Sequence, residues 1–155
     1  MSTTANAPKP KSNYKLGVYE EKFINYLMKQ GKKTIARQIF TDTLDLIKER
    51  KKGADPLEVF KAAIEHAKPA IEVRPKRVGG AMYQVPRDVP PARQLMLAYR
   101  WILEAARHKK GSPMYKKLCD ELMQASDNTG AAVKKKEDTH KMAQANKAFA
   151  HLARY

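Results

Sequence analysis

One stretch of this 155-residue chain has an extended pattern, and it limits any β-sheet to two strands. At about residues 71–89, apolar and charged residues alternate on both sides of Gly79 and Gly80, as in a β-hairpin. Pro75 and Pro86 cannot donate ladder hydrogen bonds, so neither strand can be central in a larger sheet. The pattern therefore predicts a two-stranded ribbon that protrudes from a body of helices.

Six segments with helical spacing of apolar residues surround this ribbon, three on each side. Their expected starts are near Tyr19, Lys33, Asp55, Pro91, Ser112 and Ala131. The third has the clearest start, because Asp55 can cap it and Pro56 suits the first helical position. We predict a mainly α fold: a six-helix bundle with a protruding two-stranded β-ribbon between helices three and four.

The length of the chain suits one domain. Residues 1–18 contain Lys9, Lys11 and Lys15, two prolines and no acidic residue, which is typical of a basic flexible arm. Residues 19–155 are expected to form a single helical domain that carries the ribbon at about 71–89.

The charge balance restricts the class of partner. The chain has 31 Lys and Arg against 16 Asp and Glu, a formal net charge of +15. Such a surplus repels itself in a compact state unless a polyanion neutralises it, and nucleic acid is the natural candidate. Binding to a membrane surface would need a basic amphipathic helix or a lipid signal, and no secretory signal or membrane-spanning run is evident. We expect a cytosolic protein with no membrane partner.

The positive charge concentrates in the arm, the ribbon, the fourth helix and the start of the sixth. Arg93, Arg100 and Arg107 recur every seven residues, which places them on one helix face, and only Glu104 in that helix could pair with them. Arginine suits bidentate phosphate contact, so this face is expected to bind RNA. A lysine run such as residues 134–136 could equally be a solvated face, and a hairpin could be purely structural.

Catalysis has little support in the sequence. The four histidines have no short pair spacing, and the single cysteine, Cys119, is expected to fill the core, so no zinc pattern can be assembled. Gly79 and Gly80 belong to no phosphate-binding loop between a strand and a helix. His108 and His140 are expected to face RNA or solvent. We predict no enzymatic activity, no metal and no cofactor.

Three stretches resemble one known family. Residues 73–101 have the sequence VRPKRVGGAMYQVPRDVPPARQLMLAYRW, and GKKTIARQIF and TGAAVKKKEDTHKMAQANKAFAH follow at residues 31–40 and 129–151. All three closely resemble the family of small ribosomal subunit protein seven, of bacterial type. The resemblance covers the chain from roughly Tyr19 to its end.

The resemblance implies a structural constituent of the small ribosomal subunit with no catalytic activity. Family members bind the 3′ major domain of small-subunit rRNA and nucleate assembly of the subunit head. Their ribbon lies near the exit-site tRNA and the mRNA path, and their C-terminal region approaches platform protein eleven. They act as monomers within the ribosome, and bacterial members often repress their own messenger.

Carried onto this chain, residue patterns and resemblance together give a set of expected contacts. The residues expected to bind rRNA are Lys9, Lys11, Lys32, Lys33, Arg37, Arg74, Lys76, Arg77, Arg93, Arg100, Arg107, Lys109, Lys110, Lys134, Lys135, Lys136 and Lys141. The ribbon tip expected near tRNA and mRNA consists of Gly79, Gly80, Met82, Tyr83 and Gln84.

The chain departs from the family pattern in two places. Its arm has separated lysines in place of clustered arginines, and Pro90 stands where a family arginine is common. Arg87 replaces an uncharged residue nearby, and we hypothesise that it restores the missing charge. Residue patterns alone leave two alternatives: an architectural DNA-binding protein that grips the minor groove, and a basic, catalytically inert interaction module.

Overall fold

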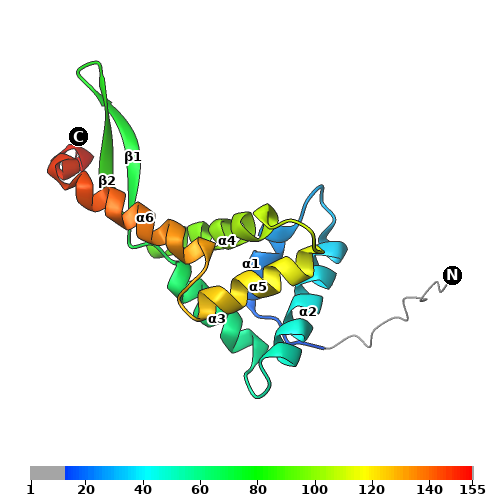
Figure 1. Ribbon diagram of the computed structural model, residues 1–155. Helices are drawn as coiled ribbons and strands as arrows, with labels where there is room; N and C mark the ends of the chain where they lie inside the picture. The colour runs from blue at the N-terminus through cyan, green and yellow to red at the C-terminus, as the bar shows by residue number, and fades with distance from the viewer. Residues whose placement is uncertain (1–12, 155) are drawn as a thin grey trace.

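The computed structural model describes residues 13–154 and has a helical body with a β-ribbon extending from it (Figure 1). In these residues the elements are α1 (Val18–Leu27), α2 (Lys33–Arg50), α3 (Pro56–Ala67), β1 (Ile71–Val78), β2 (Ala81–Asp88), α4 (Pro91–His108), α5 (Met114–Ser126), α6 (Ala131–Ala145) and the 3₁₀ helix η1 (Lys147–Arg154). The predicted fold class is confirmed. The 3₁₀ helix was not predicted.

An aromatic cluster holds four helices of the body together. The ring of Phe23 in α1 lies with its centroid 5.6 Å from that of Phe40 in α2 and 5.1 Å from that of Phe60 in α3. Its third neighbour is Tyr99 in α4, at 5.3 Å. All four side chains are buried, so each helix contributes apolar area and edge-to-face ring contacts to one centre. α5 packs across α2, α3 and α4 and completes the core.

The predicted start of α3 is confirmed at atomic level. The carboxylate of Asp55 accepts a hydrogen bond from the backbone N–H of Leu57, at 3.1 Å, and Pro56 occupies the first turn. The cap satisfies a backbone donor that would otherwise lack a partner. The cap thus fixes the residue at which α3 begins.

The ribbon is an antiparallel pair in which Val78 faces Ala81, so Gly79 and Gly80 alone form the turn. Both glycines have positive φ, +58° and +85°, the conformation that a two-residue hairpin turn requires. α6 packs along β1, and η1 packs on β2 (Figure 1). The ribbon is therefore supported by the C-terminal segment along part of its length.

The expected arm overlaps the folded body. Tyr14 and Leu16 are partly buried against the core, and the hydroxyl of Tyr14 donates to Oδ1 of Asp45 in α2 at 2.9 Å. Val18 already belongs to α1. Residues 13–18 thus lie on the body, whereas Lys9 and Lys11 lie outside the described residues.

None of the helices in residues 13–154 combines the length and the apolar character needed to cross a lipid bilayer. Within the same residues, no three His, Cys, Asp or Glu side chains are grouped as ligands of a metal ion would be. Cys119 is buried with its Sγ 3.7 Å from Sδ of Met123, and burial raises the pKa of its thiol to about 11. The thiol is therefore protonated at neutral pH, as its predicted role as a core filler requires.

Candidate nucleic-acid interface

The cations predicted to bind RNA fall into two groups. Nine of those that the structure describes have a protein partner: Lys33, Arg37, Arg74, Lys76, Arg93, Arg107, Lys109, Lys135 and Lys136. Six are exposed and have neither an ion pair nor a side-chain hydrogen bond within residues 13–154: Lys32, Arg77, Arg100, Lys110, Lys134 and Lys141. The second group needs no internal contact to be broken before it can meet a phosphate.

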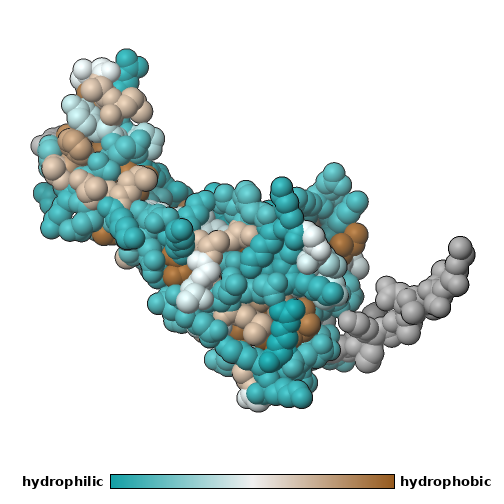
Figure 2. Space-filling view, in the orientation of Figure 1, coloured by the Kyte–Doolittle hydropathy of each residue, from teal (hydrophilic) through white to brown (hydrophobic). Residues whose placement is uncertain are grey.

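The unpaired cations lie on three elements and in two loops. Arg77 lies near the end of β1, Arg100 is in α4, and Lys134 and Lys141 are two helical turns apart on α6, whereas Lys32 precedes α2 and Lys110 follows α4. Hydrophilic side chains cover most of the body and of α6 on the face shown in Figure 2. Apolar patches on this face are small and separate. Such a surface suits contact with a highly charged partner better than contact with an apolar one.

Arg93 is not a free member of the arginine stripe, and this corrects the expectation that only Glu104 was available to it. Its Nε donates to both carboxylate oxygens of Glu72, at 2.9 and 3.0 Å, and Arg74 donates to the same carboxylate at 2.8 Å. Glu72 is buried in β1, 21 residues from Arg93 in the sequence. The base of the ribbon is thereby fixed to the first turn of α4. Glu104 pairs with Lys135 of α6 instead, at 2.7 Å.

The Glu72 carboxylate is charged in this setting. Burial alone would raise its pKa, but hydrogen bonds and positive charge from Arg93 and Arg74 outweigh burial, so the pKa is lowered from its ordinary value. A carboxyl with a lowered folded-state pKa stabilises the fold above its unfolded pKa, near 4.5. That contribution is lost as the pH falls through the lower, folded-state value.

Glu72→Gln should therefore destabilise the protein by about 1 to 2 kcal/mol at pH 7, because hydrogen bonds to a charged acceptor are replaced by weaker ones. The difference from wild type should begin to shrink below about pH 4.5, where the carboxyl of the unfolded wild-type chain takes up a proton, and it should vanish below the lower pKa of the folded carboxyl. Urea unfolding of both proteins from pH 7 to pH 3 measures this. A difference that stays constant down to pH 3 would mean that shape, and not charge, is what Glu72 contributes.

Some cations that are paired within the protein could still contact RNA. Lys33 and Arg37 flank Glu21 at 3.4 and 3.1 Å, and all three side chains remain more than a third exposed. Burial acts to raise the pKa of Glu21, yet hydrogen bonds and charge from Arg37 and Lys33 lower it overall. Exposed pairs of this kind contribute at most about 1 kcal/mol. A phosphate could replace Glu21 as the partner of these two cations at little cost.

The lysines that open α6 point in different directions. Lys134 is exposed, Lys135 pairs with Glu104, and Nζ of Lys136 donates to the backbone carbonyl of His66 in α3 at 2.6 Å. The expectation of three equivalent RNA contacts therefore fits Lys134 best. Lys135 and Lys136 fasten α6 to α4 and α3, and this link sets the direction in which Lys134 and Lys141 project.

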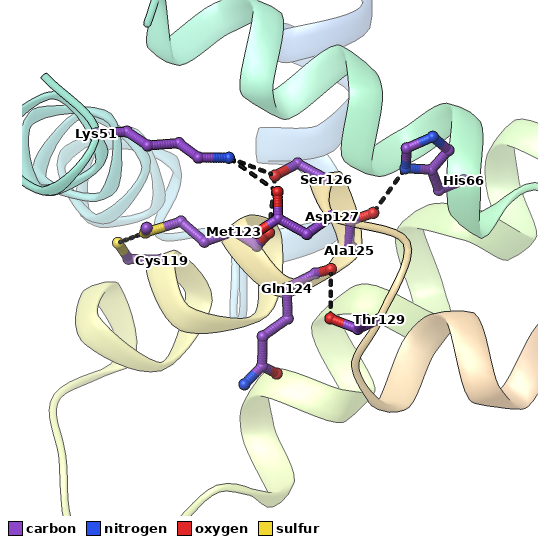
Figure 3. A network of polar contacts seen from close by, with 9 residues as sticks. All are labelled: Lys51, His66, Cys119, Met123, Gln124, Ala125, Ser126, Asp127 and Thr129. Atoms are coloured by element: carbon purple, nitrogen blue, oxygen red, sulfur yellow. Dashed lines mark hydrogen bonds and ion pairs between the residues drawn. The ribbon is translucent and has the colours of Figure 1, made fainter. Parts of the chain in front are cut away.

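The C-terminal end of α5 is held by a network that the sequence did not reveal (Figure 3). Nδ1 of His66 must donate to the carbonyl of Ala125, at 2.8 Å, because a carbonyl can only accept. Nζ of Lys51 donates to Oγ of Ser126 and to Oδ1 of Asp127, at 3.4 and 3.0 Å. These contacts tie the end of α5 to α2 and α3, and α6 begins a few residues later. The network thereby fixes the end of α5, from which the chain passes to α6 and its lysines.

His140 has a different place from the one expected. It is half-buried, and its Nε2 accepts a hydrogen bond from the backbone N–H of Ala70, at 3.1 Å, just before β1. An accepting Nε2 carries no proton, so the proton of the neutral ring is on Nδ1. His140 is thus a support for the base of the ribbon. His108 is exposed, as expected, with Nδ1 2.7 Å from the carbonyl of Glu104.

Most residues of the ribbon tip are exposed, but Tyr83 is not fully so. Gly79, Gly80 and Gln84 are exposed, and Met82 exposes 63% of its surface. Tyr83, which was expected to offer a stacking surface, is half-buried, and its ring packs on Phe149 of η1 with centroids 5.2 Å apart. One face of the Tyr83 ring therefore serves to hold the C-terminal segment.

The sequence of this chain is similar to those of known proteins. The model of the family described as Ribosomal protein S7p/S5e matches residues 2–147. A relative named small ribosomal subunit protein uS7 from Thermotoga neapolitana is 61% identical over 130 residues, which cover 84% of this chain and 83% of that protein. The protein of the same name from Rhodopirellula baltica is 59% identical over 133 residues, 85% of each chain.

A third relative with that name, from Thermoanaerobacter pseudethanolicus, is 56% identical over 130 residues, 84% of this chain and 83% of its own. The family match and the relatives each span far more than half of the chain, including the ribbon and the arginines of α4. The chain belongs to the family of ribosomal protein S7p/S5e.

Proposed function

We propose that this chain binds the 3′ major domain of small-subunit ribosomal RNA and nucleates assembly of the subunit head. The chain is a structural, non-enzymatic constituent of the small ribosomal subunit in the bacterial cytoplasm, as its family indicates. The proposal concerns what it contacts there. Its neighbours in the assembled subunit would include platform protein eleven, and a single copy would suffice.

One observation carries the proposal: the unpaired, exposed cations lie on several elements that the fold holds in fixed relation. Lys32, Arg100 and Lys110 lie on the body, whereas Arg77, Lys134 and Lys141 lie on the ribbon and α6. A folded polyanion can meet such a dispersed set at several points, which a short linear ligand cannot do. The net charge of +15 supplies the attraction over distance.

The exposed tip supports a second part of the proposal. Gly79, Gly80 and Met82 extend away from the body at the end of the ribbon (Figure 1). We assign to them a place near the exit-site tRNA and the mRNA path. Glycines there allow close approach of the backbone to RNA, and the Met82 side chain offers apolar surface.

Arg100→Ala and Arg77→Ala should each weaken binding to a 3′ major domain rRNA fragment by about 1 kcal/mol or more, since each removes a charge that can contact phosphate. The dependence of binding on salt should also flatten, because fewer counterions are released. Neither side chain is held by the fold, so the melting temperature should stay unchanged. Filter binding at several salt concentrations and thermal unfolding measure the two effects.

Lys48→Ala is the matched control, because Lys48 is also exposed and has no partner among residues 13–154, but lies outside the predicted contacts. An equal loss for Lys48→Ala would show that net charge alone governs binding. A fall in melting temperature for Arg77→Ala or Arg100→Ala would make those residues structural. If random duplex DNA competed as well as the rRNA fragment at physiological salt, specificity for ribosomal RNA would be excluded.

A further inference from the structure

A groove of about 280 Å³ lies where the ends of α1 and α4 meet the first turns of α2 and α5. Its floor is aliphatic and consists mainly of Leu27, Ile35, Ile39 and Met114. Ile35 exposes 55% of its surface, and Ile39 and Met114 are half-buried. Contiguous apolar surface inside a polar rim is typical of a site where another protein binds.

The floor includes a second apolar stripe of α2. The first stripe, which contains Ala36, Phe40 and Leu44, is buried in the core of the body. Ile35 and Ile39 are one turn apart on the neighbouring face, and Ile35 remains largely uncovered within residues 13–154. A β-branched side chain that is exposed adds nothing to helix stability. The fold alone therefore gives no reason for isoleucine at position 35.

Three cations surround this floor, and no carboxylate lines the groove in the part of the chain that the structure describes. Lys29 and Lys32 lie in the turn between α1 and α2, and Arg107 is in the last turn of α4. All three are exposed, and none forms an ion pair within residues 13–154. The groove thus has an apolar centre and a positively charged rim.

The parts of the groove are linked to one another by hydrogen bonds of the protein itself. Arg107 donates to the backbone carbonyl of Leu27 at 3.3 Å, which joins the end of α4 to the end of α1. In the turn, the backbone N–H of Lys32 donates to the carbonyl of Lys29 at 3.0 Å, so the two lysines stay close together. A ligand can meet these cations without ordering the backbone, which lowers the cost of binding.

We infer that this groove binds an acidic, amphipathic segment of another protein, an inference that goes beyond the proposed function and does not depend on it. Carboxylates of the segment match the three cations of the rim, and an apolar side chain of the segment fills the floor. The flexible Met114 side chain can adapt to that anchor. RNA matches the rim but not the floor, because unpaired bases stack on aromatic side chains and the described lining contains none.

The first test separates the floor from the rim. The probe is a fluorescein-labelled 12-residue peptide of glutamates interrupted by two leucines four positions apart, and the matched peptide has serine in place of both leucines. Anisotropy titration of the full-length protein should show at least about tenfold tighter binding of the leucine peptide, because burial of a leucine side chain contributes that much. Equal binding of the two peptides would mean that charge alone attracts them, and the inference would be overturned.

Ile35→Asn should weaken binding of the leucine peptide by about tenfold and leave that of the serine peptide unchanged, because it makes the floor polar and keeps the rim. Val18→Asn is the matched control, since Val18 is 70% exposed and lies outside the groove. The control should stay within about twofold of wild type. A loss for Val18→Asn as large as that for Ile35→Asn would refute a specific role of the groove.

Lys29→Gln combined with Lys32→Gln should weaken binding of both peptides by about tenfold and flatten its dependence on salt, because two rim charges are lost. Lys22→Gln combined with Lys48→Gln is the matched control. It removes the same charge from exposed side chains outside the groove and should change binding by less than about twofold. Similar losses in the two double variants would show that net charge, and not the rim, attracts the peptide.

Crosslinking locates the peptide without any variant. A benzophenone in place of one leucine of the probe should crosslink to the wild-type protein within residues 27–39 and 107–114, which include the lining. Crosslinks confined to other segments would contradict the proposed site. The melting temperature of Ile35→Asn should equal that of wild type, since the side chain is exposed.

Two RNA measurements separate the possible failures. If Ile35→Asn weakened binding of a 12-nucleotide oligouridylate as much as binding of the leucine peptide, the groove would be an RNA site and the inference would fail. If the wild type bound the 3′ major domain fragment but did not distinguish the two peptides, the groove inference would fail and the proposed function would stand. Distinction between the peptides without binding of the fragment would support the groove inference and refute the proposed function.

Discussion

Glu121→Ala should lower the free energy of unfolding by about 3 kcal/mol. The Glu121 side chain has no exposed surface, and its Oε1 accepts a hydrogen bond from the backbone N–H of Ala132 in the first turn of α6, at 3.0 Å. Alanine would leave that buried N–H without an acceptor and a cavity beside it, each of which costs about 1 to 3 kcal/mol. Urea unfolding measures the change.

The other carboxylate oxygen contributes less. Oε2 lies 3.1 Å from Nζ of Lys109 but without hydrogen-bond geometry, and it has no further partner in the part of the chain that the structure describes. The Lys109 side chain is 30% exposed, so on loss of Glu121 its ammonium can turn to water. We therefore attribute most of the expected effect to the N–H of Ala132 and to the lost volume, and little to the ion pair.

Glu121→Gln is the matched control, because the amide oxygen can still accept from Ala132 while the charge is removed. It should cost about 1 kcal/mol, well below the cost of alanine. Equal costs for alanine and glutamine would mean that the ion pair with Lys109 dominates, contrary to this account. Losses below 1 kcal/mol for both would mean that the start of α6 needs no acceptor.

The Glu121 contact also bears on function, since α6 carries Lys134 and Lys141. Gly130, just before α6, has φ of +93°, and a Cβ there would lie 3.2 Å from Oε1 of Glu121 and 3.0 Å from Cβ of Gln124. A side chain at Gly130 would therefore both strain the backbone and crowd the carboxylate. The start of α6 is thus fixed by a glycine, a buried acid and the Lys136 bond to α3 together.

The elements of this fold were predictable because their signals are local. Alternation around Gly79 and Gly80, the prolines of the two strands and the cap at Asp55 each act over a few residues, and all are confirmed. Helix η1 was missed because it is short and 3₁₀. Such helices seldom persist without tertiary contacts, and this one rests on Tyr83 and Lys76.

Whether each cation is paired within the fold was less predictable, because pairing depends on partners distant in sequence. Arg93 meets Glu72 across 21 residues, and Lys136 meets the carbonyl of His66 across 70. Composition and spacing identified these residues as candidate RNA contacts but could not show that they form hydrogen bonds within the fold. The unpaired residues Arg77 and Arg100 match the predicted pattern best, since nothing in the described fold competes for them. That these residues contact rRNA remains a prediction.

Two single substitutions on η1 bracket the effect expected from removing residues 147–155, a truncation that should loosen the ribbon. His151→Ala changes an exposed residue whose Nδ1 bonds only within η1, to the carbonyl of Ala148, and should leave the ribbon unaffected. Phe149→Ala should produce a part of the effect of full truncation, because it removes the aromatic pair and keeps the Lys76 contact. An effect of His151→Ala as large as that of Phe149→Ala would contradict a specific role for the ring.

Removal of residues 147–155 should loosen the ribbon while the helical body stays folded. An isolated two-stranded hairpin is at best marginally stable in water, and here η1 supplies the Tyr83–Phe149 pair and the carbonyl that accepts from Lys76. Loss of these contacts and of the apolar area that they bury should cost the ribbon about 2 to 3 kcal/mol locally. Amide hydrogen exchange in β2 should then accelerate by roughly 30- to 150-fold, since 1.4 kcal/mol corresponds to tenfold, while exchange in α2 and α5 should be unchanged.

If exchange in β2 stayed at the wild-type rate, α6 alone would be shown to support the ribbon. If exchange rose throughout, η1 would be part of the global fold and not a local brace.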